Sequence, residues 1–286
     1  MTGVVLGVAA AFCWAGLDVV RKALADKASP VAIAVVLLLG QLPFLFAWAS
    51  IDGSWVARDV YWGPALGSMA MNALANVFFM RSLQLSPMSR TVPFLALSPV
   101  FSLWVAAPLL GEVPSMPHVM GVALVVAGSV VLNSDLGARW WGGVIAEPGA
   151  RYMIAVAVLW AGSLALDKVA LPHAAPSTHA LILTTGSGVM LLGWVASQGR
   201  IGELRVALRA PRPLLFGLVA FAVAAIGLQM LALGFLWVAV VETLKRGLGV
   251  VGSIVFGRIF FLEPFTGRKI VAAGLMAGGA AVLALT

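Results

Sequence analysis

The chain has 286 residues, of which 62% are hydrophobic and only 10% are charged, whereas a soluble domain carries about 25% charged residues. Too few polar residues are present to cover even one soluble domain. A soluble enzyme, a nucleic-acid-binding module and a disordered scaffold are therefore excluded. The net charge of +7 comes mostly from basic residues between apolar runs, where such residues orient membrane helices. The composition predicts an all-α integral membrane protein.

The first half of the chain contains five apolar segments, and a helix needs about 20 such residues to span a bilayer. The first runs from Gly3 to Val20 and carries one charge, Asp18. The next four contain no Asp, Glu, Lys or Arg: 28–51, 60–80, 91–111 and 113–134. Strands are not expected, because no alternation with period two is present. Tyr61 and several tryptophans lie near segment ends, as in an interfacial aromatic belt.

The second half gives five more helices, provided that one ambiguous region is divided. Three segments are clear: 152–171, 178–197 and 269–285. Between the last two, residues 213–241 are uncharged, and Glu242, Lys245 and Arg246 follow. A loop at these charges would leave one long and one short helix. A break at 234–237 gives two ordinary helices with the charges inside the second, so we predict ten transmembrane helices.

An internal repeat supports this division. The stretch 14–22 recurs 146 residues later as 160–168, and Glu112 recurs as Glu263. An odd number of helices in each unit places the two units in opposite orientations. Inverted repeats are typical of alternating-access transporters, with the substrate site between the repeats near the midplane. The predicted parts are a first five-helix repeat (1–134), a connecting loop (135–150) and a second five-helix repeat (151–286).

The three charges of the predicted ninth helix are the main candidate for a binding site. Glu242 lies three residues before Lys245 and four before Arg246, so all three share one helix face. Because Glu242 can neutralise only one cation, one positive charge is left for a ligand. Arg246 would bind an anion through two of its nitrogens, and Lys245 would attract the anion as a point charge. The alternative is a structural cluster at the membrane interface.

Two tryptophan-containing faces could form symmetric walls and gates. The first helix aligns Trp14 and Asp18 at a spacing of four, with Lys22 one turn further. The sixth aligns Trp160, Ser163 and Asp167, with Lys168 beside them. In the alternative, the acids and lysines are ordinary surface pairs and the tryptophans are belt residues. Asp18 is the deeper acid in this interpretation and the better candidate proton carrier.

Further polar and small residues have two possible uses. Ser68, Asn72 and Asn76 have a spacing of four in the third helix; they could line a polar cavity, which we favour, or bond to a neighbouring helix. Gly274 and Gly278 form a small face for internal packing, the preferred use, or for a homodimer contact.

Metal and nucleotide motifs are missing from the sequence. His118, His173 and His179 have no cysteine or carboxylate at metal-ligand spacing. No nucleotide-binding Gly-x-x-x-x-Gly-Lys-Ser/Thr motif is present. We therefore expect no cofactor, no metal and no nucleic-acid partner, with transport driven by gradients.

The two repeats resemble the EamA-type drug/metabolite transporter superfamily. The similarity is carried by Pro-Val-Phe at 99–101, by Glu112 and Glu263 at helix ends and by the glycine-rich fifth and tenth helices. It implies ten helices, a central cavity and transport of small metabolites. Thr243-x-Lys245-Arg246 also resembles the Lys-Arg pair that organophosphate translocators of the superfamily use to hold phosphate. Those translocators also have a lysine in the fourth helix, and this chain has Leu95 at the corresponding position.

The sequence leaves the orientation in the membrane open. Loops after odd-numbered helices hold most Lys and Arg residues, and the even loops hold only Arg58 and Lys168. The positive-inside rule then places both termini outside, whereas the resemblance implies cytoplasmic termini.

The predicted function is secondary transport of a small polar, anionic metabolite across the plasma (inner) membrane by alternating access. Lys245 and Arg246 would bind the anion, Asn72 and Asn76 would donate hydrogen bonds, and the two tryptophans would form the walls. Amino acids or amphipathic drugs are alternative substrates. A membrane-embedded enzyme using Asp18 or Glu242 as acid or base, or a scaffold protein, is the alternative of another class.

Overall fold

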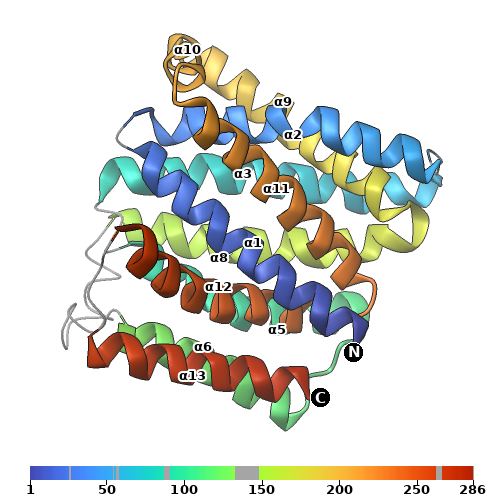
Figure 1. Cartoon of the computed structure of the whole chain (residues 1–286). Coiled ribbons are helices and arrows are strands. Elements are labelled where there is room, and N and C mark those ends of the chain that lie inside the picture. Colours follow the sequence, from blue (N-terminus) through green and yellow to red (C-terminus); the bar gives the residue numbers. More distant parts are fainter. Residues whose placement is uncertain are drawn as a thin grey trace.

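The computed structural model describes residues 1–25, 27–53, 55, 58–86, 91–132, 148–261 and 266–285. Within these ranges the chain forms eleven α-helices, three 3-10 helices and no strand (Figure 1), so the all-α prediction is confirmed. The α-helices are α1 (Thr2–Ala25), α2 (Pro30–Asp52), α3 (Trp62–Leu85), α5 (Ser98–Leu110), α6 (Met116–Leu132), α8 (Pro148–Ala170), α9 (Pro176–Ser197), α10 (Gly202–Leu208), α11 (Arg212–Leu233), α12 (Val238–Phe261) and α13 (Gly267–Ala284). The 3-10 helices are η1 (Asp59–Tyr61), η2 (Val92–Leu97) and η4 (Leu171–His173).

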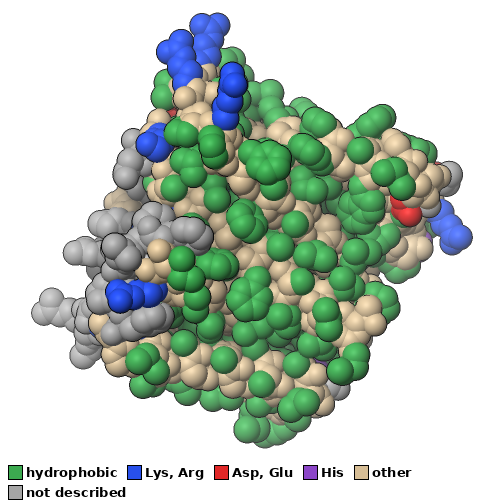
Figure 2. All heavy atoms as spheres, in the orientation of Figure 1, with side chains coloured by type: hydrophobic (Ala, Val, Ile, Leu, Met, Phe, Trp, Pro, Cys, Tyr) green, Lys and Arg blue, Asp and Glu red, His purple; other side chains and the backbone are tan. Residues whose placement is uncertain are grey.

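Helix length and surface composition identify a multi-pass integral membrane protein. Six helices are long and apolar enough to span a membrane, and two shorter ones are also apolar. The six are α1, α2, α8 extended through η4, α9, α11 and α13. In Figure 2 apolar side chains cover the broad visible face, while Lys and Arg gather at its margins. This distribution suits a surface in contact with lipid chains.

Local sequence signals fix several helix ends. Ser29 caps α2 by accepting a hydrogen bond from the Ala32 amide at 3.3 Å, and Pro30 follows in the first turn. The same helix ends at Gly53, whose φ of 68° lies in the left-handed region that glycine adopts without steric cost. The break predicted at 234–237 is confirmed, because α11 ends at Leu233 and α12 begins at Val238.

Two expected boundaries differ from the observed ones. The helix predicted over 91–111 is divided into η2 and α5, with Pro99 in the first turn of α5, where its missing N–H costs nothing. The predicted connecting loop, 135–150, is shortened because α8 already begins at Pro148; its residues 135–147 lie outside the described ranges.

Helix packing relates the two halves of the chain. α1 packs against α11 and α12, and α8 packs correspondingly against α3 and α5. Three further pairs join one helix from each half: α2 with α9, α5 with α12, and α6 with α13. Both termini lie at the same end of the bundle, away from α10 (Figure 1).

Glycines allow α6 and α13 to approach closely. A Cβ on Gly279 would lie 2.6 Å from the carbonyl oxygen of Gly121, and one on Gly128 would lie 2.9 Å from that of Ala272. The prediction that Gly274 and Gly278 serve internal packing is wrong. A Cβ at either position would meet nothing within 4 Å. The next glycine, Gly279, faces α6 instead, because one residue turns the side-chain direction by about 100°.

Candidate functional site

The three predicted charges of α12 meet in the bundle interior. Glu242 is fully buried, and its Oε1 accepts hydrogen bonds from Ser98 Oγ at 2.5 Å and from Arg246 Nε at 3.0 Å. Its Oε2 lies 2.6 Å from Lys245 Nζ. We call Glu242, Lys245 and Arg246 the α12 charge cluster. With all three groups ionised it carries one net positive charge.

Two tryptophans from the two halves of the chain face these cations. Lys245 Nζ lies 5.6 Å from the ring centroid of Trp14, and Arg246 Cζ lies 5.5 Å from that of Trp160. Trp14 is fixed by its Nε1, which donates to Gln229 Oε1 at 3.0 Å. These contacts lie within the range of cation–π attraction. The tryptophans thus face the charge cluster rather than forming a belt.

Arg246 retains donors that could bind an anion. Among the described residues, its contacts are the Nε bond to Glu242 and the Trp160 ring. Its two terminal nitrogens are thereby left for a ligand, and 21% of the side chain is exposed. A guanidinium held by one nitrogen can still present a two-nitrogen edge to a carboxylate or phosphate.

The polar residues of α3 bond to protein groups. Asn72 Nδ2 donates to Ser163 Oγ at 2.8 Å, and Asn76 Nδ2 donates to the Asn72 carbonyl oxygen at 2.8 Å. The second predicted alternative, bonding to a neighbouring helix, therefore holds for Asn72. Both amides are only half-buried.

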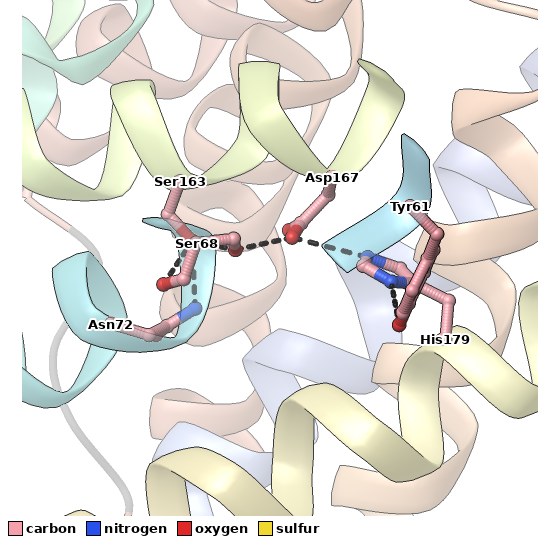
Figure 3. Close-up of polar contacts among 6 residues, drawn as sticks. All are labelled: Tyr61, Ser68, Asn72, Ser163, Asp167 and His179. Carbon is pink, nitrogen blue, oxygen red and sulfur yellow. Dashed lines mark hydrogen bonds and ion pairs between the residues drawn. The ribbon is translucent and has the colours of Figure 1, made fainter. Parts of the chain in front are cut away.

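A second buried network continues from Ser163 (Figure 3). Ser68 Oγ lies 2.8 Å from Ser163 Oγ and also donates to Asp167 Oδ1. The same carboxylate oxygen is 3.1 Å from His179 Nε2, while His179 Nδ1 is 2.9 Å from the Tyr61 hydroxyl. We call Tyr61, His179 and Asp167 the buried triad, since each is at most 2% exposed.

A third contact closes the end of the bundle near the α11–α12 turn. Lys168 Nζ donates to Glu112 Oε1 at 2.5 Å and to the Leu236 carbonyl oxygen at 2.6 Å. Glu112 Oε2 accepts from the Val238 amide at 2.9 Å, in the first turn of α12. These bonds join α8, the segment that follows α5, and the α11–α12 turn, and we call them the Lys168 latch.

The other end of α8 borders an open pocket of about 390 Å³. Residues of α3, α8 and α9 line it, including Arg81, Tyr152 and Trp194, together with Arg200. Tyr152 and Lys168 are 16 residues apart on one helix, which corresponds to roughly 24 Å. The pocket and the latch therefore lie at opposite ends of the bundle.

The structure corrects the predictions for the acidic residues. Asp18 is not the deeper acid: its side chain is 60% exposed and pairs with Arg21 at 3.3 Å, so it lies outside the buried cluster. Asp167 and Lys168 do not form a surface pair, because the former contacts His179 and the latter Glu112. Tyr61, expected in the aromatic belt, is fully buried against His179.

Sequence reasoning missed Ser98 and His179 as functional residues. The sequence analysis considered His179 only as a metal ligand, yet it lies buried inside α9. In the sequence, the only signal for the latch was that Glu112 recurs in the second half as Glu263. No group of three or more His, Cys, Asp or Glu side chains suited to a metal occurs among the residues that the structure describes.

Comparison with known proteins agrees with this architecture. The model of the EamA-like transporter family matches residues 1–134. The first half of this chain is therefore similar to the EamA-like transporter family. The match confirms the resemblance found in the sequence and indicates a membrane transporter of small molecules. No curated protein matches the chain significantly.

A solved structure extends the similarity over the second half. A crystal structure described only as that of a protein matches 100% of this chain and 96% of its own, with 18% sequence identity and a TM-score of 0.77. Identity this low shows a shared fold and carries no information on substrate.

Proposed function

We propose that this EamA-like protein is a secondary transporter that moves a small anionic metabolite across the plasma (inner) membrane by alternating access. The observation that carries the proposal is the α12 charge cluster. It has two cations and one carboxylate inside the bundle, each cation faces a tryptophan, and Arg246 has nitrogens to spare. Charges at membrane depth are costly, on the order of 3 kcal/mol each on insertion scales, and mark functional sites.

The size of the electrostatic effect is sufficient for useful affinity. A monoanion about 4 Å from one uncompensated cation gains roughly 4 kcal/mol at an effective dielectric constant of about 20. This corresponds to an affinity change of several hundred-fold. In the proposed site Lys245 and Arg246 bind the anion, and Trp14 and Trp160 form the walls. Asn72 and Asn76 supply polar groups from α3. Asp18 is omitted because it is exposed.

The helix pairings support ten spanning helices in two inverted repeats. The contacts of α1 with α11 and α12 have counterparts in those of α8 with α3 and α5, as a twofold relation between halves would produce. On this proposal α10 is the only α-helix in the described residues that does not span. The latch at one end and the pocket at the other suit a carrier that is closed on one side.

The experiment is a thermal-shift panel on detergent-purified protein with phosphorylated metabolites, carboxylates, amino acids and organic cations. A ligand that binds the native state raises the melting temperature by mass action. We expect an anion to stabilise wild type and to lose this effect in Lys245→Ala and Arg246→Ala. Lys27→Ala and Arg209→Ala, which remove exposed cations, are the matched controls.

Two outcomes would count against an anion site. One is stabilisation only by cations or zwitterions. The other is stabilisation by anions that is unchanged in both α12 variants. Either result would make Lys245 and Arg246 structural charges and would favour amino acids or amphipathic drugs as substrates. A positive result identifies the compound to follow in liposome flux assays.

A further inference from the structure

The buried triad is not among the groups that contact the anion in the proposed site, although it is a deeply enclosed group of ionisable side chains. Asp167 and His179 are at most 2% exposed, and their contact joins α8 to α9. Tyr61 contacts the opposite side of the imidazole ring and is also fully buried. A carboxylate and an imidazole in hydrogen-bond contact offer adjacent sites for a proton.

The geometry allows this pair to hold or release a proton while both ring nitrogens of His179 keep a hydrogen-bond partner. In the neutral ring, Nε2–H donates to Asp167 Oδ1 and the Tyr61 hydroxyl donates to Nδ1. When a proton is added at Nδ1, the ring donates on both sides and the Tyr61 oxygen becomes the acceptor. A hydroxyl can make this exchange because it both donates and accepts.

The charged groups around the triad are few. On α8, Lys168 is paired with Glu112 in the latch. α12 packs against α8 and carries the three groups of the α12 charge cluster. η4 packs against α8 and carries His173. α5 and η2 contain no ionisable residue. The remaining charged residues near η1 and the end of α2 are exposed: Asp52, Arg58 and Asp59.

Two routes connect the triad to the proposed anion site. The first is electrostatic: Asp167 on α8 and Lys245 on α12 belong to helices that pack against each other, and charges in a low-dielectric interior act on each other over several ångströms. Asp167 also shares Ser68 with Ser163, and Ser163 lies one turn from Trp160, whose ring faces Arg246. A change in the charge of the triad therefore changes the field at the cations that hold the ligand.

We propose that Asp167 and His179, assisted by Tyr61, form a proton-binding site whose loading and release couples substrate movement to a proton gradient. The coupling rests on the proposed transport function, whereas proton binding by the triad does not. Protonating the triad makes the region around Lys245 and Arg246 more positive and so strengthens anion binding. Release of the proton on the other side of the membrane weakens binding and favours unloading.

The first experiment measures proton binding without any substrate. Infrared difference spectra of purified protein, recorded between about pH 5 and pH 9, report carboxyl and imidazole protonation. We expect a titrating signal in wild type that disappears in Asp167→Asn and in His179→Gln. Asp59→Asn, which removes an exposed acid from η1, should leave the signal unchanged. A wild-type spectrum without such a signal, or one identical to that of Asp167→Asn, overturns the proposal.

A milder variant keeps the test decisive if the first two fold poorly. Tyr61→Phe preserves the ring and removes only the hydroxyl that faces His179 Nδ1. We expect its titration midpoint to move by about one pH unit, the equivalent of one hydrogen bond. A purely structural triad would lose stability in Tyr61→Phe and show no shifted titration.

The second experiment tests coupling in proteoliposomes, with succinate and inorganic phosphate as labelled probes. Exchange without a pH gradient is compared with accumulation driven by one. Asp167→Asn should keep exchange and lose gradient-driven accumulation by at least about 5-fold. Retained accumulation, or loss of both activities in a folded protein, overturns coupling at this site.

The two proposals fail in different ways. Wild-type protein that exchanges neither probe counts against the anion transport proposed above, while the infrared titration still decides proton binding. Conversely, Lys245→Ala should abolish exchange and keep the titrating signal of the triad.

Discussion

The helices α1 and α8 carry matching sequence stretches, yet their C-terminal ends have different environments. In the middle of the two helices the halves behave alike, since Trp14 and Trp160 each face a cation of the α12 charge cluster. At the ends they differ. Asp18 of α1 is 60% exposed, whereas Asp167 of α8 is buried against His179. The end of α8 is thus held by buried contacts with other helices, whereas Asp18 forms an exposed pair with Arg21 of its own helix.

This difference shows that a repeat in sequence does not require a repeat in conformation. Asp167 and Lys168 are enclosed because His179 of α9 contacts the former and Glu112, from the segment after α5, contacts the latter. In the proposed arrangement of two inverted halves, similar helix ends lie on opposite sides of the membrane, and a carrier closed on one side would hold them in different environments.

The largest expected effect is the difference in stability between Asp167→Ala and Asp18→Ala. Asp167→Ala leaves buried His179 and Ser68 without their partner, and loss of one member of a buried pair costs about 3–5 kcal/mol. Asp18→Ala breaks only an exposed pair, worth about 1 kcal/mol or less. Thermal or denaturant unfolding in detergent measures both. Equal losses in the two variants would break the contrast between α1 and α8.

The two lysines provide the next comparison. Lys168→Ala removes the bonds to Glu112 and to the Leu236 carbonyl and should open this end of the bundle. In a Cys13→Ala background, the thiol of a Leu236→Cys variant should react about 10-fold faster with an impermeant maleimide once the latch is removed, since hydrogen bonds to charged groups contribute about 1.5–3 kcal/mol. Lys22→Ala, the matching change in α1, is the control. A similar increase with Lys22→Ala would contradict a latch specific to α8.

The comparison can be extended to α6 and α13, where the two halves are alike. Gly128→Ala and Gly279→Ala each place a Cβ against backbone of the partner helix, and overpacking costs about 1–3 kcal/mol. The adjacent Gly278→Ala meets nothing within 4 Å and should gain about 0.5–1 kcal/mol of helix stability. Melting temperatures distinguish the three variants, and a destabilised Gly278→Ala would indicate a packing partner for that face.

The smallest effect concerns pH and lies in the loop that carries α10. Hydrogen bonds from Arg200 and then Ser29 lower the pKa of the Glu203 carboxyl below its ordinary value of 4.5. The stabilisation is therefore complete above that value and is lost as pH falls through the lower folded-state pKa. Because both charged partners are about one-third exposed, the gain is below about 1 kcal/mol. Glu203→Gln should slightly weaken the dependence of the melting temperature on pH between pH 6 and pH 4. An unchanged dependence would show that the Arg200–Glu203 pair does not contribute to stability.

The α12 charge cluster shows how far sequence reasoning reached. Spacings of three and four residues predict a shared helix face, and the ion pairs of Glu242 with Lys245 and Arg246 agree. The break at 234–237 followed from span length alone. Ser98, which also bonds Glu242, was missed because it is 144 residues away in the chain.

The buried triad shows where that reasoning fails. Tyr61 and His179 are 118 residues apart, and each has an ordinary local explanation, as an aromatic at a segment end or as a single histidine. For the same reason Asp18 was predicted to be the deeper acid and Asp167 was not. The position of a residue along its own helix does not determine which other helices pack around that residue.

The sequence by itself determined the membrane class, the helix boundaries near 234–237, the internal repeat and the grouping of charges on α12. These features depend on composition and on periods of a few residues, which the backbone converts directly into position. Tertiary structure decided which acid is buried, which lysine forms the latch and which glycines face a partner helix. Those properties depend on contacts between helices far apart in the chain, and packing selects between alternatives that have equal local propensity.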